Sequence, residues 1–186
     1  MRGCLGCRIA TVDGAESQFL VWKISTAALY AREYPRLITT LERMAERASI
    51  RDDLPINLLA LFGSVARLTP HKCSDADLLV LFTGCPDHLT ELERTTDLVH
   101  IIRRAEDETV DEQYRWPIMP IPGDERTSDL DPDFVATVSR EGVLLYHRPG
   151  ALIPDALTHL EPFEQWQRRV NERLARRRLA SVESAP

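Results

Sequence analysis

The chain has 186 residues, a formal net charge of -6 and 44% hydrophobic residues. This balance predicts one globular domain with short extensions and excludes a wholly disordered chain. Its longest apolar runs, such as residues 58–62, reach about five residues, whereas a membrane-spanning helix needs about 20. The first residues lack the apolar segment of a signal peptide. We therefore expect a cytoplasmic protein with no membrane partner.

The four cysteines, Cys4, Cys7, Cys73 and Cys85, are too few and too scattered for a disulfide framework, so reduced thiols are expected. Cys4 and Cys7 form a C-x-x-C pair, which is half of a zinc site, but the usual second pair is absent. We expect residues 1–16 to be a disordered leader, and the role of these two cysteines stays open.

The first half of the chain predicts helices followed by two buried strands. Apolar residues recur every three or four positions between residues 24 and 48, as on the buried stripe of a helix. Because proline fits the first turn of a helix but not its interior, we expect Pro35 to divide this stretch into two helices. The nearly continuous apolar runs Ile56–Phe62 and Ala76–Phe82 predict central strands buried on both faces.

The second half predicts a helix over residues 89–103, an edge strand over 115–121 that contains two prolines, a short helix over 131–139 and a final turn and strand over 142–146. This order of elements indicates an α/β (α+β) fold with a small mixed β-sheet flanked by helices.

A basic amphipathic helix is expected over residues 162–180. Phe163, Trp166, Val170 and Leu174 form its apolar stripe, and six arginines surround that stripe. The arginines could bind RNA phosphates, but such a pattern is more commonly the solvated face of a docking helix. The acidic main body of the chain also argues against general affinity for nucleic acid. A nucleic-acid partner is therefore not favoured.

The first chemical signal is the strand that ends in Gly63-Ser64. Such a turn presents backbone N–H groups and a hydroxyl where a phosphate can be gripped, and Gly63 allows close approach. Arg67, one turn further on, can add a charge-assisted contact. Taken alone, this pattern is weak.

The second signal is Ser74-Asp75-Ala76-Asp77, at the start of the next strand. Because alternate residues of a strand share a face, Asp75 and Asp77 are expected to project together. Two such carboxylates repel each other unless a divalent cation neutralises them, and oxygen ligands suit Mg²⁺, with Mn²⁺ as the alternative ion. For an isolated D-x-D, a turn followed by a strand-end charge would be the commoner meaning.

Together, residues 61–67 and 74–80 resemble the signature of the DNA polymerase β-like nucleotidyltransferase superfamily and, more narrowly, of minimal nucleotidyltransferase (MNT-type) proteins. Residues 141–146 resemble the segment that closes many of these domains. The resemblance implies a polymerase β-like nucleotidyltransferase fold over residues 17–150, followed by a C-terminal basic helix and tail over 151–186.

This resemblance also implies an activity and roles for the site residues. A nucleoside monophosphate would pass from an NTP, with ATP the expected nucleotide, to a hydroxyl acceptor, and pyrophosphate would be released. Gly63, Ser64, Arg67 and Ser74 would bind the nucleotide. Asp75 and Asp77 would be the catalytic, metal-binding carboxylates that hold magnesium.

The family pattern has a third carboxylate on a later strand, and this sequence departs from it. The expected strand over residues 115–121 contains no Asp or Glu. Asp111 and Glu112 precede it, and Asp124 and Glu125 follow it, so whether one of them completes the site stays open.

Three functions are therefore considered. The first is the antitoxin of a toxin–antitoxin pair, which attaches a nucleotide to a HEPN-type toxin. The second is a small-molecule nucleotidyltransferase of the aminoglycoside type, which would need an added acceptor-binding domain, although the segment after Tyr146 is short. The third is a catalytically weakened nucleotide-binding module. The acceptor, the base preference and the oligomeric state are not determined by these residues.

Overall fold

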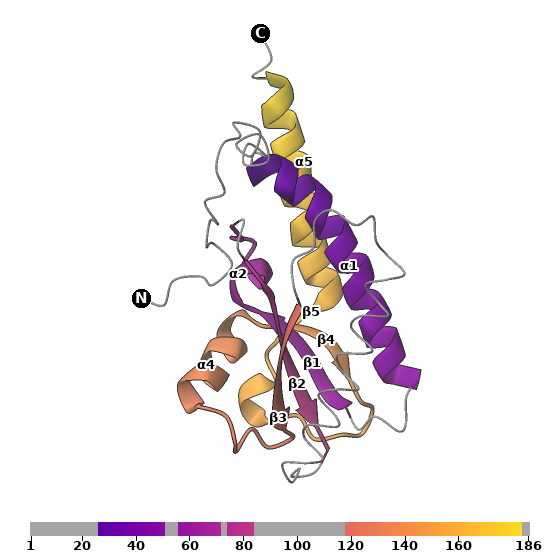
Figure 1. The fold of residues 1–186 in the computed structure, drawn as a ribbon, viewed down its shortest axis with the longest axis vertical. Helices are drawn as coiled ribbons and strands as arrows, with labels where there is room; N and C mark the ends of the chain where they lie inside the picture. Colours follow the sequence, from indigo (N-terminus) through magenta and orange to yellow (C-terminus); the bar gives the residue numbers. More distant parts are fainter. Residues whose placement is uncertain (1–25, 51–55, 72–73, 84–117, 184–186) are drawn as a thin grey trace, which may run out of the picture.

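The computed structural model describes residues 26–50, 56–71, 74–83 and 118–183 (Figure 1). In chain order, its elements are α1 Thr26–Ile50, β1 Ile56–Phe62, α2 Gly63–Ala66, β2 Ala76–Phe82, β3 Ile118–Asp124, α4 Pro132–Glu141, β4 Val143–His147, the 3₁₀ helix η3 Asp155–Leu157, β5 Glu161–Pro162 and α5 Phe163–Glu183. No helix in these ranges is long and apolar enough to cross a membrane. The expected leader and the helix over residues 89–103 lie outside the described residues.

The five strands form one mixed sheet in the order β3-β2-β1-β4-β5. Strand β1 is antiparallel to both β2 and β4, whereas β2 runs parallel to β3 and β4 parallel to β5. Every residue of β1 is buried, and so is every residue of β2 except Asp77. The predicted fold class and the two central strands are therefore confirmed, because both strands have neighbours on either side and helices over both faces.

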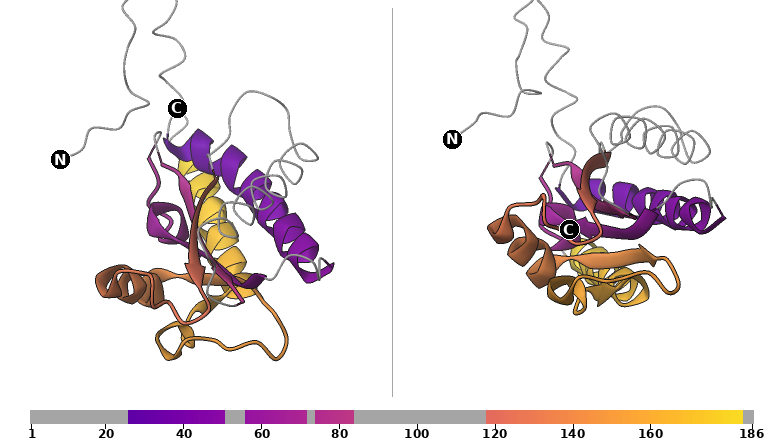
Figure 2. Two further views of the ribbon diagram at one scale, coloured as in Figure 1. Left: turned by 60° about the horizontal axis from the view of Figure 1, so that its bottom comes forward. Right: turned by 90° about the horizontal axis from the view of Figure 1, so that it is seen from below.

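The two faces of the sheet carry separate cores. Alternate residues of β1, Leu59 and Leu61, pack with α1 and α5, whereas Leu58, Ala60 and Phe62 pack with α4 and the segment around η3. Figure 1 shows α1 and α5 side by side, and Figure 2 shows α4 on the other side of the molecule from α1. The Gly63-Ser64 turn at the end of β1 therefore lies between two layers of helices.

The predicted division at Pro35 is wrong, because α1 is one helix with Pro35 in its interior. Proline removes the hydrogen bond to the carbonyl four residues earlier, which here belongs to Ala31. Both Ala31 and Pro35 are exposed, so water can satisfy that carbonyl. The buried stripe formed by Tyr34, Leu37 and Leu41 continues past the proline and holds both halves against the sheet.

The remaining elements agree with the predictions in kind but differ in their ends. Strand β3 begins at Ile118 and ends at Asp124, later than expected, although it does lie at the edge of the sheet. Helix α4 begins after Asp131, whose carboxylate accepts hydrogen bonds from the N–H groups of Asp133 and Phe134. Helix α5 is confirmed, whereas η3 and β5 were not predicted.

The end of β3 is held by the buried side chain of Asp124. Its Oδ1 atom accepts hydrogen bonds from Arg126 N at 2.9 Å and Ser128 N at 3.0 Å, and Ser128 Oγ donates to Oδ2. Burial alone would raise the pKa of this carboxyl, but these hydrogen bonds stabilise the anion and hold the pKa below its ordinary value of 3.8. Through these hydrogen bonds the Asp124 carboxylate stabilises the loop between β3 and α4.

We expect Asp124→Ala to lower the free energy of unfolding at pH 7 by about 1–3 kcal/mol, because several buried donors lose their acceptor. A depressed pKa in the folded state gives stability that is present above the ordinary value and lost as the pH falls through the folded value. Urea unfolding followed by circular dichroism should therefore show the difference at pH 7 and little difference near pH 2. Asp155→Ala, on the exposed side of η3, is the control, and an equal loss in both variants would contradict the prediction.

Candidate active site

The end of β1 and the start of β2 meet at one end of the sheet. Phe62 is paired with Asp77, and Leu61 is paired with Leu78 on one side and with Val143 of β4 on the other. The antiparallel register thus brings the Gly63-Ser64 turn, the two aspartates and the residue before β4 to one place. These residues are up to 79 positions apart in the sequence but lie in or next to three adjacent strands.

Gly63 is in direct contact with the carboxylate of Asp77. A Cβ atom built on Gly63 would lie 2.4 Å from Asp77 Oδ2, and the φ of Gly63 is +77°, in the left-handed region. Both the space and the backbone conformation therefore require a residue without a side chain. As a result, the turn lies against the Asp77 carboxylate with no room for a side chain between them.

Ser64 is held by the loop that precedes β2. Its Oγ donates a hydrogen bond to Ser74 Oγ at 3.0 Å, and Ser74 Oγ also accepts one from His71 N at 2.9 Å. Ser74 is only 5% exposed, so it is better placed to position Ser64 than to meet a ligand itself. The hydroxyl of Ser64 is therefore held against Ser74, the residue that directly precedes Asp75.

The environment of Asp77 favours a cation. Burial raises the pKa of its carboxyl, the neighbouring Asp75 and Glu141 raise it further, and Arg67 partly opposes them. Asp75 and Asp77 thus lie within each other's electrostatic reach, which destabilises the pair unless positive charge arrives. Mg²⁺ is typically bound by one or two carboxylates together with substrate phosphates and water, so this pair fits it. Within the described ranges there is no cluster of three His, Cys, Asp or Glu side chains that could hold a metal alone.

Glu141 joins the site although the sequence did not single it out. It is the last residue of α4, two positions before β4 begins, and its carboxylate accepts a hydrogen bond from Arg67 Nη1. The Glu141 side chain is 10% exposed and that of Arg67 is 47% exposed. The nearly buried carboxylate therefore anchors a guanidinium that is still accessible to solvent. The available signal was the position of Glu141 at the start of residues 141–146, two positions before a strand that pairs with β1.

Neither Asp124 nor Glu125 completes the site. Asp77 is paired with Met119 of β3, whereas Asp124 is paired with Phe82, five residues further along and therefore roughly 17 Å away at the usual rise of a strand. Glu125 accepts a hydrogen bond from Asn57 at that same far end of the sheet. The other two candidates, Asp111 and Glu112, lie outside the described residues.

Comparison with known proteins places this site in a family. Residues 41–122, which include the turn and both aspartates, match the family model described as the nucleotidyltransferase domain. This match confirms the resemblance to nucleotidyltransferases. The protein is accordingly an enzyme of the nucleotidyltransferase class.

The chain is also similar to solved structures, all at low sequence identity. No curated protein matches the chain. A protein from Sulfolobus solfataricus, provisionally assigned as a nucleotidyltransferase, is 19% identical with a TM-score of 0.41, over 69% of this chain and 94% of its own. A toxin–antitoxin structure with AMP-PNP gives 18% and 0.36, over 80% and 94%. A chain from the Shewanella oneidensis complex of tri-AMPylated HEPN toxin and MNT antitoxin gives 18% and 0.36, over 78% and 96%.

We expect Gly63→Ala to reduce nucleotide transfer at least about 100-fold, because the added methyl group displaces the Asp77 carboxylate and an alanine at positive φ costs about 1–2 kcal/mol. Gly150→Ala is the matched control. Its φ is +79°, but no atom lies within 4 Å of the added Cβ, so it carries the backbone cost without the collision. Equal activity of the two variants would show that contact with Asp77 is unimportant.

We expect Asp77→Asn to melt at a higher temperature than the wild type at pH 7 in the absence of divalent metal. The pKa of Asp77 is raised by folding, so the stability associated with its acid form is present below 3.8 and lost as the pH rises through the folded value. An amide has no charge to bury. Differential scanning calorimetry at pH 7 and near pH 3 tests this, since the difference should shrink at the lower pH; a lower melting temperature of the variant at pH 7 would refute it.

Proposed function

We propose that this protein is a magnesium-dependent nucleotidyltransferase that moves AMP from ATP to a hydroxyl group of a partner protein. The observation that carries the proposal is the contact between the Gly63 backbone and Asp77, whose carboxylate is electrostatically coupled to that of Asp75. The Ser64 hydroxyl of the same turn is bonded to Ser74, the residue before Asp75. Because a turn suited to binding phosphate contacts one carboxylate of the pair, the triphosphate and its metal ion would bind at the same place. Asp75 and Asp77 are the metal-binding residues in this proposal, and Gly63, Ser64 and Arg67 meet the nucleotide.

The chemistry follows from this arrangement. When bound, the magnesium ion would neutralise the triphosphate and favour departure of pyrophosphate. The Gly63 and Ser64 backbone and the Ser64 hydroxyl orient the phosphate chain, and Arg67 offers a guanidinium to its oxygens. The acceptor oxygen then forms a bond to the α-phosphorus. At the same time the bond between the α-phosphorus and the oxygen that bridges the α- and β-phosphates breaks, and pyrophosphate leaves. Positioning and charge do most of this work, as in other phosphoryl and nucleotidyl transfers.

A protein acceptor is favoured by the way the chain folds after β4. Phe163, Trp166, Val170 and Leu174 of α5 are buried in the same core as α1 and the sheet. Helix α5 therefore completes the nucleotidyltransferase domain, and the described residues after β4 do not form a separate domain that could enclose a small acceptor. The partner we propose, on the strength of the MNT-type motif, is a HEPN-type toxin, which makes this chain the antitoxin of the pair.

The proposal is tested by incubating the protein with Mg²⁺ and α-labelled ATP, with the product of a neighbouring gene or with an aminoglycoside as acceptor. We expect label on the protein partner, and we expect Asp75→Asn and Asp77→Asn to reduce it at least about 100-fold because each removes a metal ligand.

Asp155→Asn, which removes an exposed carboxylate on η3, should label the partner normally. Label on the aminoglycoside alone would replace the protein acceptor with a small one. An absence of label on every acceptor with Mg²⁺ or Mn²⁺, together with no binding of ATP, would overturn the proposed activity.

A further inference from the structure

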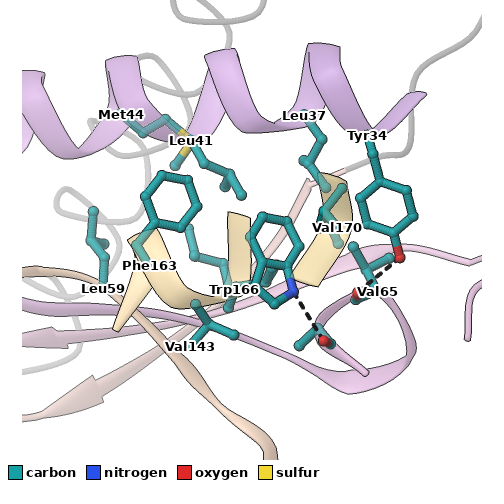
Figure 3. Close-up of a cluster of buried hydrophobic side chains, with 14 of the residues drawn as sticks. Tyr34, Leu37, Leu41, Met44, Leu59, Val65, Val143, Phe163, Trp166 and Val170 are labelled. Atoms are coloured by element: carbon teal, nitrogen blue, oxygen red, sulfur yellow. Dashed lines mark hydrogen bonds between the residues drawn. The ribbon is translucent and has the colours of Figure 1, made fainter. Parts of the chain in front are cut away.

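The side of the Gly63-Ser64 turn that faces the core is held by three aromatic side chains. Tyr34 donates a hydrogen bond to the carbonyl of Val65 at 3.0 Å, and Trp166 Nε1 donates one to the carbonyl of Ala66 at 3.0 Å (Figure 3). Tyr30 donates a third to the carbonyl of Leu68. Two donors come from α1 and one comes from α5, so the two long helices hold the turn jointly.

The turn satisfies only part of these carbonyls with its own backbone. The carbonyls of Gly63, Ser64 and Val65 accept hydrogen bonds from the N–H groups of Arg67, Thr69 and Leu68, but α2 has only four residues and Ala66 has no following turn to supply a donor. Leu68, just beyond α2, has a φ of 60°, a conformation that costs a non-glycine residue about 1 kcal/mol or more. Surrounding contacts must therefore stabilise this backbone.

The three donors lie in a row of packed rings. The centroids of Tyr30 and Tyr34 are 5.1 Å apart, those of Tyr34 and Trp166 are 6.0 Å apart, and Trp166 stacks on Phe163 at 5.6 Å. Tyr34 and Trp166 are fully buried. Rings packed in this way have little rotational freedom, so the directions of the hydroxyl and the indole N–H are fixed.

Burial alone does not require these polar groups. Phenylalanine would supply the same contacts without a hydroxyl, and burying an O–H or N–H is unfavourable unless it finds a partner. Here each partner is a carbonyl of the short segment that follows Gly63 and Ser64. The chain therefore places its buried aromatic donors where they orient the turn that meets the nucleotide.

We propose that Tyr34 and Trp166 are positioning residues for the nucleotide site. They do not contact the nucleotide; they hold α2 so that the Gly63 and Ser64 backbone and the Ser64 hydroxyl face the triphosphate. Because Trp166 belongs to α5 and Tyr34 to α1, the affinity for the triphosphate depends on α5 being docked on α1. This inference rests on the proposed function and identifies what supports its binding turn.

The experiment compares Tyr34→Phe, Trp166→Phe and the double variant with two controls. Thr40→Val removes a buried hydroxyl of α1 that bonds the carbonyl of Arg36 at 3.1 Å, and Val170→Ala removes buried volume from α5. Neither control removes a hydrogen bond to the turn. Calorimetric titration with Mg-ATP gives Kd, steady-state transfer gives KM and kcat, thermal melting gives Tm, and amide exchange without ligand reports on residues 64–66.

We expect each single variant to raise Kd and KM for ATP about 5-fold and the double variant about 20-fold or more, with kcat nearly unchanged and faster exchange at residues 64–66. The two controls should lower Tm by about as much as the Tyr34→Phe and Trp166→Phe variants do, while their Kd stays within about twofold of the wild-type value. Variants that lose Tm as the controls do but keep the wild-type Kd would overturn the positioning role while leaving the activity standing. Failure of the wild type itself to bind Mg-ATP would instead overturn the proposed function, and the positioning role with it.

Discussion

The contact between Gly63 and the carboxylate of Asp77 is the constraint on which the site depends. Strand pairing sets it, because the antiparallel register places Phe62 opposite Asp77 and leaves the next residue of β1 to turn directly over that carboxylate. Only a residue without a Cβ can do so. The distance between the Gly63-Ser64 turn and the carboxylate pair that we propose to bind metal is therefore fixed by β1 and β2, the two most buried of the described strands.

Each helical layer contributes a different property to this contact. Helices α1 and α5 lie behind the turn, bury the apolar face of α2 and donate hydrogen bonds to its carbonyls through Tyr34 and Trp166. Helix α4, on the opposite face, brings Glu141 to Arg67 and adds negative field at Asp77. Negative charge gathered at a half-buried carboxylate is unfavourable in the protein alone, and a divalent cation with its nucleotide would relieve it. Binding sites commonly carry such local instability.

Much of this architecture could be read from the chain. Apolar runs predicted β1 and β2 with their observed bounds, because strands buried on both faces need continuous apolar residues. The Gly63-Ser64 and Asp75–Asp77 motifs predicted a shared site, and the structure brings them together. Two predictions differ from the structure where tertiary packing outweighs a local preference. Pro35 lies inside α1 because the buried stripe of that helix continues on both sides of it. Strand β3 extends to Asp124, beyond its expected end, because its pairing with β2 continues that far.

The sequence by itself determined the class of chemistry, since residue types such as Gly63, Ser64, Asp75 and Asp77 limit what a site can bind. It also determined which segments would be buried, through the spacing of apolar residues. Only the tertiary structure decided which distant groups join the site: Glu141 enters it, whereas Asp124 and Glu125 lie at the far end of the sheet. The physical reason is that strand order and register bring residues together without regard to their separation in the chain, and no local pattern records either property.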